Sequence, residues 1–184
     1  MPYEPPPELA ALSLSEIAEL VAARKLPPVE GWAPQKTGDS EMRIAADGKW
    51  YHRGGEITRP AMVRAFSTLL SRDGDGGTWL VSPFEKLAIA VDDAEFVATD
   101  MTAADGGLAF RLNTDDLVIA GPGHPIRAAG DRDTPALYLS VRRGCEARLN
   151  RSTYEQLIQH AIERGGKPLA VESAGAIFNL TPGE

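Results

Sequence analysis

The stretch Arg53-Gly54-Gly55-Glu56-Ile57 has a counterpart 90 residues later, Arg143-Gly144-Cys145-Glu146-Ala147, and this pair divides the chain into two similar halves. In each half the stretch is followed by apolar residues at helical spacing and then by two short apolar segments. Such self-similarity predicts an α+β fold of two small lobes built from a repeated strand-helix-strand-strand unit and preceded by an N-terminal helix. Because amphipathic helices align easily, a chance match is the alternative.

Capping and turn signals place the other elements around this unit. Three helix starts are predicted from an N-cap residue with a suitable residue in the first turn: Ser13 with Glu16, Thr58 with Pro60, and Ser152 with Glu155. Asp47-Gly48 predicts a hairpin turn. Apolar runs bounded by turn residues predict strands at residues 42–44, 49–52, 78–81, 87–91, 95–98, 108–112, 117–120, 125–128, 136–141, 145–149, 169–172 and 176–180.

These elements predict three parts of the chain. Residues 1–40 form the N-terminal helix and a wrapping coil, in which residues 1–12 are frayed and Trp32 anchors the coil to a core. Residues 41–104 form the first α+β domain and residues 105–184 the second. A chain of 184 residues is long enough for two domains near the lower size limit.

Composition limits the compartment and the partners. The formal net charge of -7 argues against general nucleic-acid binding, and no apolar stretch is long enough for a membrane span. The acidic, proline-rich N-terminus does not resemble a secretory signal, and the single cysteine forms no internal disulfide, so we expect a cytoplasmic protein. Arg143 and Arg148 near Cys145 would lower the pKa of its thiol.

Most catalytic signatures are absent. The chain has no Walker loop, no Gly-x-Ser-x-Gly elbow and no His-Glu-x-x-His motif. Its three histidines lie far apart, so we predict no metal site and no cofactor. These absences favour a binding or sensor protein over an enzyme.

Charged residues beside predicted turns are the candidate ligand-binding groups. Arginine presents a planar fork of donors that suits phosphate or carboxylate, and paired acids can share a proton or hold a cation. An outward-facing Trp ring can stack on a planar ligand. The predicted site consists of Trp50, Glu85, Lys86, Asp92, Asp93, His124, Arg127, Arg142 and Arg143. For each residue singly, ion pairing at the surface, or core packing for Trp50, is the alternative.

The chain also resembles a known family through several short motifs in order. They are Leu26-Pro27-Pro28-Val29, Trp32 with Pro34, Asp47-Gly48-x-Trp50, Arg59, Ser82-Pro83-Phe84-Glu85-Lys86, Val91-Asp92-Asp93-Ala94-x-Phe96, His124-Pro125-Ile126-Arg127 and Val141-Arg142. From about Leu26 onward the chain resembles the bacterial domain of unknown function family 1285. The resemblance implies two α+β domains with repeated motifs and a cleft between them that holds a nucleotide-like ligand in a signalling role. Ser82 and Glu95 depart from the family's usual Thr and Pro.

Three functions remain open. The preferred hypothesis is a sensor whose interdomain cleft binds a nucleotide-like or other small anion through Lys86, His124, Arg127 and Arg142. The second is a hydrolase or transferase acting on a phosphorylated small molecule, with Glu85, Asp92 or Asp93 as base and His124 as acid. The third is a protein-interaction adaptor that uses the N-terminal helix and an exposed apolar patch.

Overall fold

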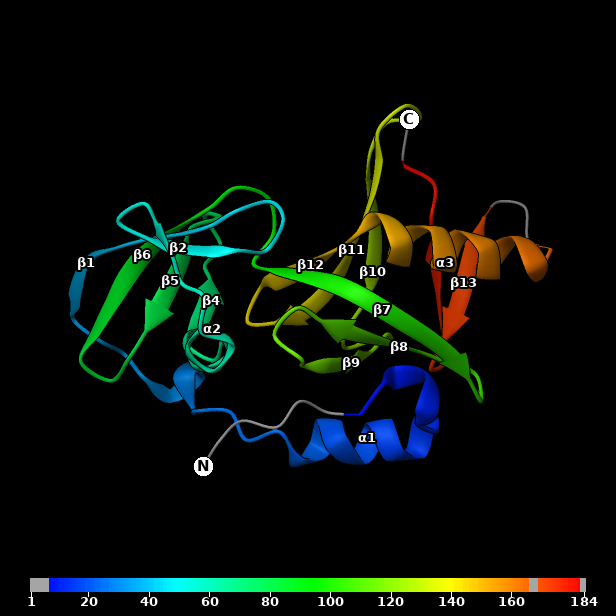
Figure 1. Ribbon diagram of the computed structural model, residues 1–184, viewed down its shortest axis with the longest axis horizontal. Helices are drawn as coiled ribbons and strands as arrows, with labels where there is room; N and C mark the ends of the chain where they lie inside the picture. Colours follow the sequence, from blue (N-terminus) through cyan, green and yellow to red (C-terminus); the bar gives the residue numbers. More distant parts are fainter. Residues whose placement is uncertain (1–6, 166–168, 183–184) are drawn as a thin grey trace.

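The computed structural model describes residues 7–165 and 169–182, and in it two lobes lie side by side (Figure 1). The sheet of the first lobe has the spatial order β3 (Gly55–Glu56), β2 (Trp50–His52), β1 (Lys36–Ile44), β6 (Glu85–Val91), β5 (Thr78–Val81) and β4 (Leu70–Arg72). The sheet of the second lobe has the order β10 (Ile126–Gly130), β11 (Pro135–Arg142), β12 (Cys145–Leu149), β7 (Phe96–Ala104), β8 (Gly107–Leu112) and β9 (Leu117–Ile119).

A separate hairpin pairs β13 (Ala170–Ser173) with β14 (Ala176–Asn179). The helices are α1 (Leu14–Ala23), α2 (Pro60–Ser67) and α3 (Arg151–Glu163), with short 3-10 turns at Leu9–Ala11 and Val29–Gly31. The predicted two-domain α+β fold is confirmed.

Both large sheets have the same strand order. In each, two three-stranded antiparallel meanders are joined at the centre by a parallel pair, which is β1 with β6 in the first lobe and β7 with β12 in the second. Matching β1–β6 to β7–β12 in chain order therefore gives one topology twice.

This correspondence differs from the one that the sequence predicted. The stretch 53–57 forms the β2–β3 hairpin at a sheet edge, whereas 143–147 forms the β11–β12 turn near the middle of the other sheet. The two stretches share a turn conformation, with φ of 50° at Arg53 and 82° at Gly54, and 48° at Arg143 and 76° at Gly144. Two consecutive positive φ angles are what a two-residue type I′ hairpin requires. The similarity between residues 53–57 and 143–147 therefore indicates that both form the same type of turn. It does not indicate that they occupy equivalent positions in the two sheets.

The border between the sheets also lies earlier than predicted. Strand β7, residues 96–104, pairs with β8 and β12 and so belongs to the second sheet. The predicted border at 104/105 falls instead on the β7–β8 turn, where Asp105 and Gly106 have φ of 48° and 79°. Local sequence does not separate the two cases, because an Asp-Gly turn inside a long hairpin and a domain linker use the same residue types.

The N-terminal segment packs on the second lobe before the chain crosses to the first (Figure 1). Ser13 Oγ accepts from the backbone N–H of Glu16 at 3.1 Å, and the Glu16 carboxylate accepts from Ser13 N–H at 3.2 Å, which confirms the predicted capping box. Ile17 and Leu9 are buried against Ala109 of β8, so residues 7–12 are not frayed as predicted. The rest of that prediction, for residues 1–6, lies outside the described residues. Strand β1 begins at residue 36, inside the predicted coil.

The other two helix starts differ by one or two residues from the prediction. The N-cap of α3 is Asn150, whose Oδ1 accepts from Thr153 N–H at 2.9 Å, rather than Ser152. Helix α2 is preceded by Arg59 and begins at Pro60, which has no backbone N–H to satisfy. Within the described ranges, every helix is too short or too polar to cross a bilayer.

One continuous core runs through both lobes. Trp50 of β2 is 1% exposed and stacks on Phe66 of α2, with ring centroids 6.4 Å apart. The same cluster of apolar side chains includes Phe96 and Phe110 of the second sheet. The predicted ligand-stacking role of Trp50 therefore does not fit the structure, because the ring is enclosed by core residues.

Candidate functional site

The β11–β12 turn of the second lobe inserts into the first lobe. Arg143 Nη1 donates to the carbonyl oxygens of Thr68 at 2.8 Å and Leu70 at 3.2 Å, and the backbone N–H of Arg72 donates to the Arg143 carbonyl at 2.9 Å. The Arg143 side chain is 4% exposed, and its Nε donates to Glu30 at 2.9 Å. One arginine thus ties the second lobe to the first lobe and to the N-terminal coil.

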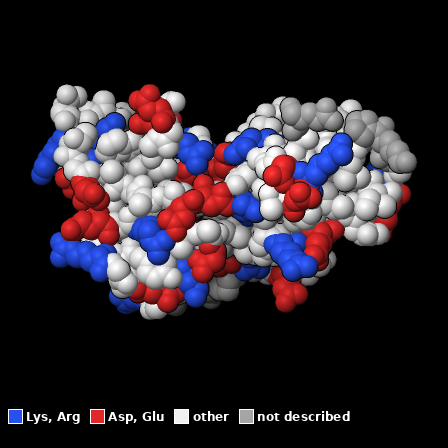
Figure 2. Space-filling view, turned by 90° about the horizontal axis from the view of Figure 1, so that it is seen from above, with Lys and Arg blue, Asp and Glu red and all other residues white. Residues whose placement is uncertain are grey.

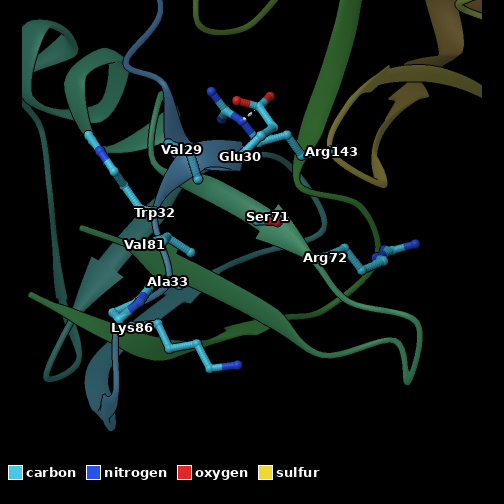
Figure 3. Close-up of a pocket in the computed structure, with 10 residues that line it drawn as sticks. Val29, Glu30, Trp32, Ala33, Ser71, Arg72, Val81, Lys86 and Arg143 are labelled. Carbon is cyan, nitrogen blue, oxygen red and sulfur yellow. Dashed lines mark hydrogen bonds and ion pairs between the residues drawn. The ribbon is translucent and has the colours of Figure 1, made fainter. Parts of the chain in front are cut away.

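A cavity of about 460 Å³ opens beside this junction (Figure 3). Its lining comes from the N-terminal coil, from β4, β5 and β6 of the first lobe, and from the inserted turn, through Val29, Glu30, Trp32, Ala33, Pro34, Ser71, Arg72, Val81, Lys86 and Arg143. This volume is typical of small-molecule sites. The walls combine an indole ring and aliphatic side chains with a hydroxyl, a carboxylate and three cations.

The three cations of the cavity differ in their partners. Arg143 is paired with Glu30, and Arg72 donates to Glu95 at 2.8 Å. The Lys86 ammonium lies 4.3 Å from the centroid of the Trp79 ring, and no carboxylate of the described residues lies within ion-pair distance of it. A cation held over an aromatic face and lacking an anionic partner is available to a ligand.

The predicted residues fall into separate groups. The preferred hypothesis placed Lys86, His124, Arg127 and Arg142 in one cleft, and of these four only Lys86 lines the cavity. Arg143, another predicted site residue, lines it as well. Glu85 lies beside it in β6, with its carboxylate 3.7 Å from Lys36 Nζ. Asp92 is ion-paired with Arg43 at the surface.

A second group gathers on Tyr138 of β11. Asp93 accepts from the Tyr138 hydroxyl at 2.5 Å and from Arg148 at 2.9 Å, and Arg127 lies 4.3 Å from the Tyr138 ring centroid. Burial, and then the hydrogen bond to Asp93, raise the pKa of Tyr138. Arg127 also binds Glu146 through two donors, at 2.7 and 3.0 Å. These groups neutralise one another.

The last predicted residues lie apart from the cavity. His124 directs Nδ1 to the carbonyl of Ser140 at 3.1 Å, and Arg142 is mostly buried and faces Asp116 at 3.6 Å. The predicted convergence of Lys86, His124, Arg127 and Arg142 on one hollow is therefore not observed. On the face shown in Figure 2, basic and acidic residues are interspersed over both lobes, which agrees with this mutual pairing.

Four polar or aromatic residues of the cavity were not among the predicted site residues, namely Glu30, Trp32, Ser71 and Arg72. Trp32 was assigned to a core but is only half-buried. Its place within a motif shared with a family was the one signal that pointed to it.

The fold and the cavity define a class: a two-lobed α+β protein with a small-molecule-sized site where the N-terminal coil meets both lobes. Residues 27–94 match the N-terminal domain of the domain of unknown function DUF1285, and residues 95–180 match its C-terminal domain. The chain belongs to the DUF1285 family, and the family's own division at 94/95 agrees with the border between the sheets.

Two solved structures of this family are similar to the chain. A DUF1285 family protein from Silicibacter pomeroyi DSS-3 is 38% identical, with a TM-score of 0.74 and coverage of 90% of this chain and 94% of that one. A DUF1285 family protein from Shewanella baltica OS155 is 23% identical, with a TM-score of 0.53, coverage of 64% of this chain and 90% of that one, and it supports the fold alone. No protein of curated function matches the chain.

Cys145, beside the inserted turn, is expected to be unreactive in the folded protein. Burial, and then the charge of Glu95, raise the pKa of its thiol to about 12, the opposite of the shift expected from the neighbouring arginines. At pH 8 only about one thiol in ten thousand is then ionised, and the side chain is fully buried. Dithionitrobenzoate should therefore label Cys145 at once in guanidinium chloride and far more slowly in native buffer. Equal rates in the two solutions would contradict the placement.

Proposed function

We propose that the protein is a ligand-binding or sensor module that takes a small, nucleotide-like anion into the cavity between Trp32 and Lys86. The observation that carries the proposal is the Lys86 ammonium, which lines the cavity with no carboxylate partner among the described residues. The net charge of the protein is negative, so a Lys86 ammonium on the cavity wall without a described carboxylate beside it favours an anionic ligand there.

The other walls fit a ligand with a planar part. The half-buried Trp32 offers a ring on which a base can stack, and Val29 and Val81 exclude water from its edges. Ser71 supplies a hydroxyl for a hydrogen bond. We infer further that the two sheets descend from one duplicated unit, because they have the same strand order.

The two alternatives have less support. The enzyme hypothesis needs a free base, yet Asp92 and Asp93 are each bound to an arginine, and Glu85 lies 3.7 Å from Lys36. It also needs a free acid, yet His124 contacts a backbone carbonyl. The adaptor hypothesis needs an available N-terminal helix, yet α1 buries Ile17 against the second lobe. Removing residues 1–25 would uncover that apolar surface and would also remove Arg24 from its buried aspartate partner.

Thermal unfolding in the presence of nucleotides tests the proposal. A nucleotide at ten times its Kd should raise the Tm by about 4 °C, because binding to the folded state alone adds stability. Lys86→Ala should abolish this rise. Lys36→Ala is the matched control, because Lys36 lies on the adjacent strand, is largely exposed and is already paired with Glu85. No rise with any of AMP, ATP, GMP or a cyclic dinucleotide, or an equal rise in both variants, would refute it.

A further inference from the structure

The cavity beside the lobe junction has a cation at one end and an acceptor at the other. Figure 3 shows Lys86 at one end of the group of lining residues and Glu30, beside Arg143, at the opposite end. In this view Val81 lies between the two ends. Among the described residues that line the cavity, Glu30 supplies the only carboxylate. A ligand that contacts both ends therefore needs an anionic group for Lys86 and hydrogen-bond donors for Glu30.

Arg143 is not the group that a ligand meets at the Glu30 end, because all three nitrogens of its guanidinium already donate. Its Nε donates to Glu30 at 2.9 Å and its Nη2 to the Pro27 carbonyl at 3.2 Å. Its Nη1 donates to the carbonyls of Thr68 and Leu70. The Arg143 side chain is 4% exposed, whereas that of Glu30 is 69% exposed. The accessible polar group at this end is thus the Glu30 carboxylate.

The Glu30 carboxylate has acceptor positions to spare. An ionised carboxylate offers about four lone-pair positions. The bond from Arg143 uses a position on Oε1, and the backbone N–H of Glu30 itself also bonds to the carboxylate. That backbone bond, and then the bond from Arg143, lower the pKa of Glu30, so the group is ionised at neutral pH and acts only as an acceptor. The Arg143 Nε–H also fixes the direction of the carboxylate.

A carboxylate with open positions on both oxygens binds two parallel N–H donors, in the way that it binds the fork of an arginine. Guanine carries such a pair on one edge, the N1–H and the 2-amino group. Adenine has an acceptor, N1, at the corresponding position, and this nitrogen would face the carboxylate without a proton between them. A site built to accept from two donors rejects an analogue that lacks them. A fixed carboxylate in the wall therefore distinguishes the two purines.

We propose that the ligand of this cavity is a guanine nucleotide, whose N1–H and 2-amino group donate to Glu30, whose base stacks on Trp32 and whose phosphate binds Lys86. This inference rests on the nucleotide-binding function proposed above and assigns its base. Trp32 is half-buried, lines the cavity and follows Glu30 by two residues. One short segment of the coil thus supplies both the stacking ring and the acceptor.

Binding of GMP, IMP and AMP to the full chain measures the contribution of each donor. IMP keeps the N1–H but lacks the 2-amino group, and AMP lacks both donors. A hydrogen bond to a charged acceptor is worth about tenfold in affinity, so the Kd should rise about tenfold from GMP to IMP and about tenfold again to AMP. Calorimetric titration gives the three constants.

Glu30→Gln tests the assigned acceptor. Glutamine keeps an oxygen for Arg143 Nε, so the variant should fold, and its Tm without ligand checks this. Its amide nitrogen is a donor that opposes the donors of guanine, so the roughly hundredfold preference for GMP over AMP should fall below about threefold. Glu85→Gln is the matched control, because it makes the same change in a carboxylate that lies beside the cavity and is paired with Lys36. It should keep the preference.

Lys86→Ala separates this inference from the proposed function. It should weaken GMP and AMP by the same factor, because both carry the phosphate, and leave the ratio of their Kd values unchanged. If the three nucleotides bind equally and Lys86→Ala weakens all of them, the nucleotide site stands and the guanine assignment is wrong. A preference for GMP that survives Glu30→Gln also overturns the assignment. If none of the three binds, this inference fails, and the proposed function fails with it if ATP and the cyclic dinucleotide do not bind either.

Discussion

Gly144→Ala is expected to lower the free energy of unfolding by about 3 kcal/mol or more, through left-handed strain and a backbone clash together. Gly144 has a φ of 76°, and a Cβ there would lie 2.8 Å from the carbonyl oxygen of Arg72 and 3.3 Å from its Cβ. Both atoms belong to the other lobe, so relief requires the lobes to separate at the point where Arg72 N–H binds the Arg143 carbonyl.

Gly54→Ala is the matched control for this change. Gly54 occupies the same turn position in the β2–β3 hairpin with a φ of 82°, but no atom lies within 4 Å of the added Cβ. It should therefore cost only the left-handed strain, about 1 kcal/mol. Urea denaturation of both variants measures the difference. Equal losses would mean that the β11–β12 turn does not dock as described.

Glu95→Ala is expected to cost about 3–5 kcal/mol, the usual penalty for breaking a buried ion pair from one side. The carboxylate is fully buried and accepts from Arg72 Nε at 2.8 Å, Thr78 Oγ1 at 3.0 Å and the backbone N–H of Glu146 at 3.0 Å. Arg72 and Thr78 belong to the first lobe and Glu146 to the second. Its removal leaves three donors at the lobe junction without this acceptor.

Asp92→Ala provides the comparison, since it removes a carboxylate only three residues away. Asp92 is paired with Arg43 at the surface, where an ion pair contributes about 0–1 kcal/mol. Chemical denaturation of both variants should thus show a large loss for Glu95 and a small one for Asp92. A loss below about 1 kcal/mol for Glu95→Ala would show that its contacts do not hold the lobes together.

The role of Glu95 at the lobe junction could not be predicted from the family resemblance. The resemblance placed proline at this position, and a departure from it indicates no particular role for the glutamate. The structure instead shows a side chain that binds both lobes, through a partner 51 residues later in the chain. No local pattern predicts an acceptor for a donor so distant.

Short-range physics accounts for what the sequence alone determined. The capping box at Ser13, the turn at Asp47-Gly48 and the short apolar runs of the strands each depend on residues within a few positions. The capping box and the turn form as predicted. The α+β class with two lobes followed from their order. Local sequence does not distinguish a hairpin turn from a domain border, and the predicted border at 104/105 fell inside the β7–β8 hairpin.

Tertiary structure decided the sites. The parallel pairs β1 with β6 and β7 with β12 bring together strands separated by several others, and register across such pairs depends on burial throughout the sheet. The folded arrangement of strands and loops brings Arg127 and Arg142 to carboxylate partners, whereas none of the described carboxylates lies within ion-pair distance of Lys86. A charge is free or neutralised according to which acid the fold brings within about 4 Å, and in a chain with 26 acids composition cannot determine that.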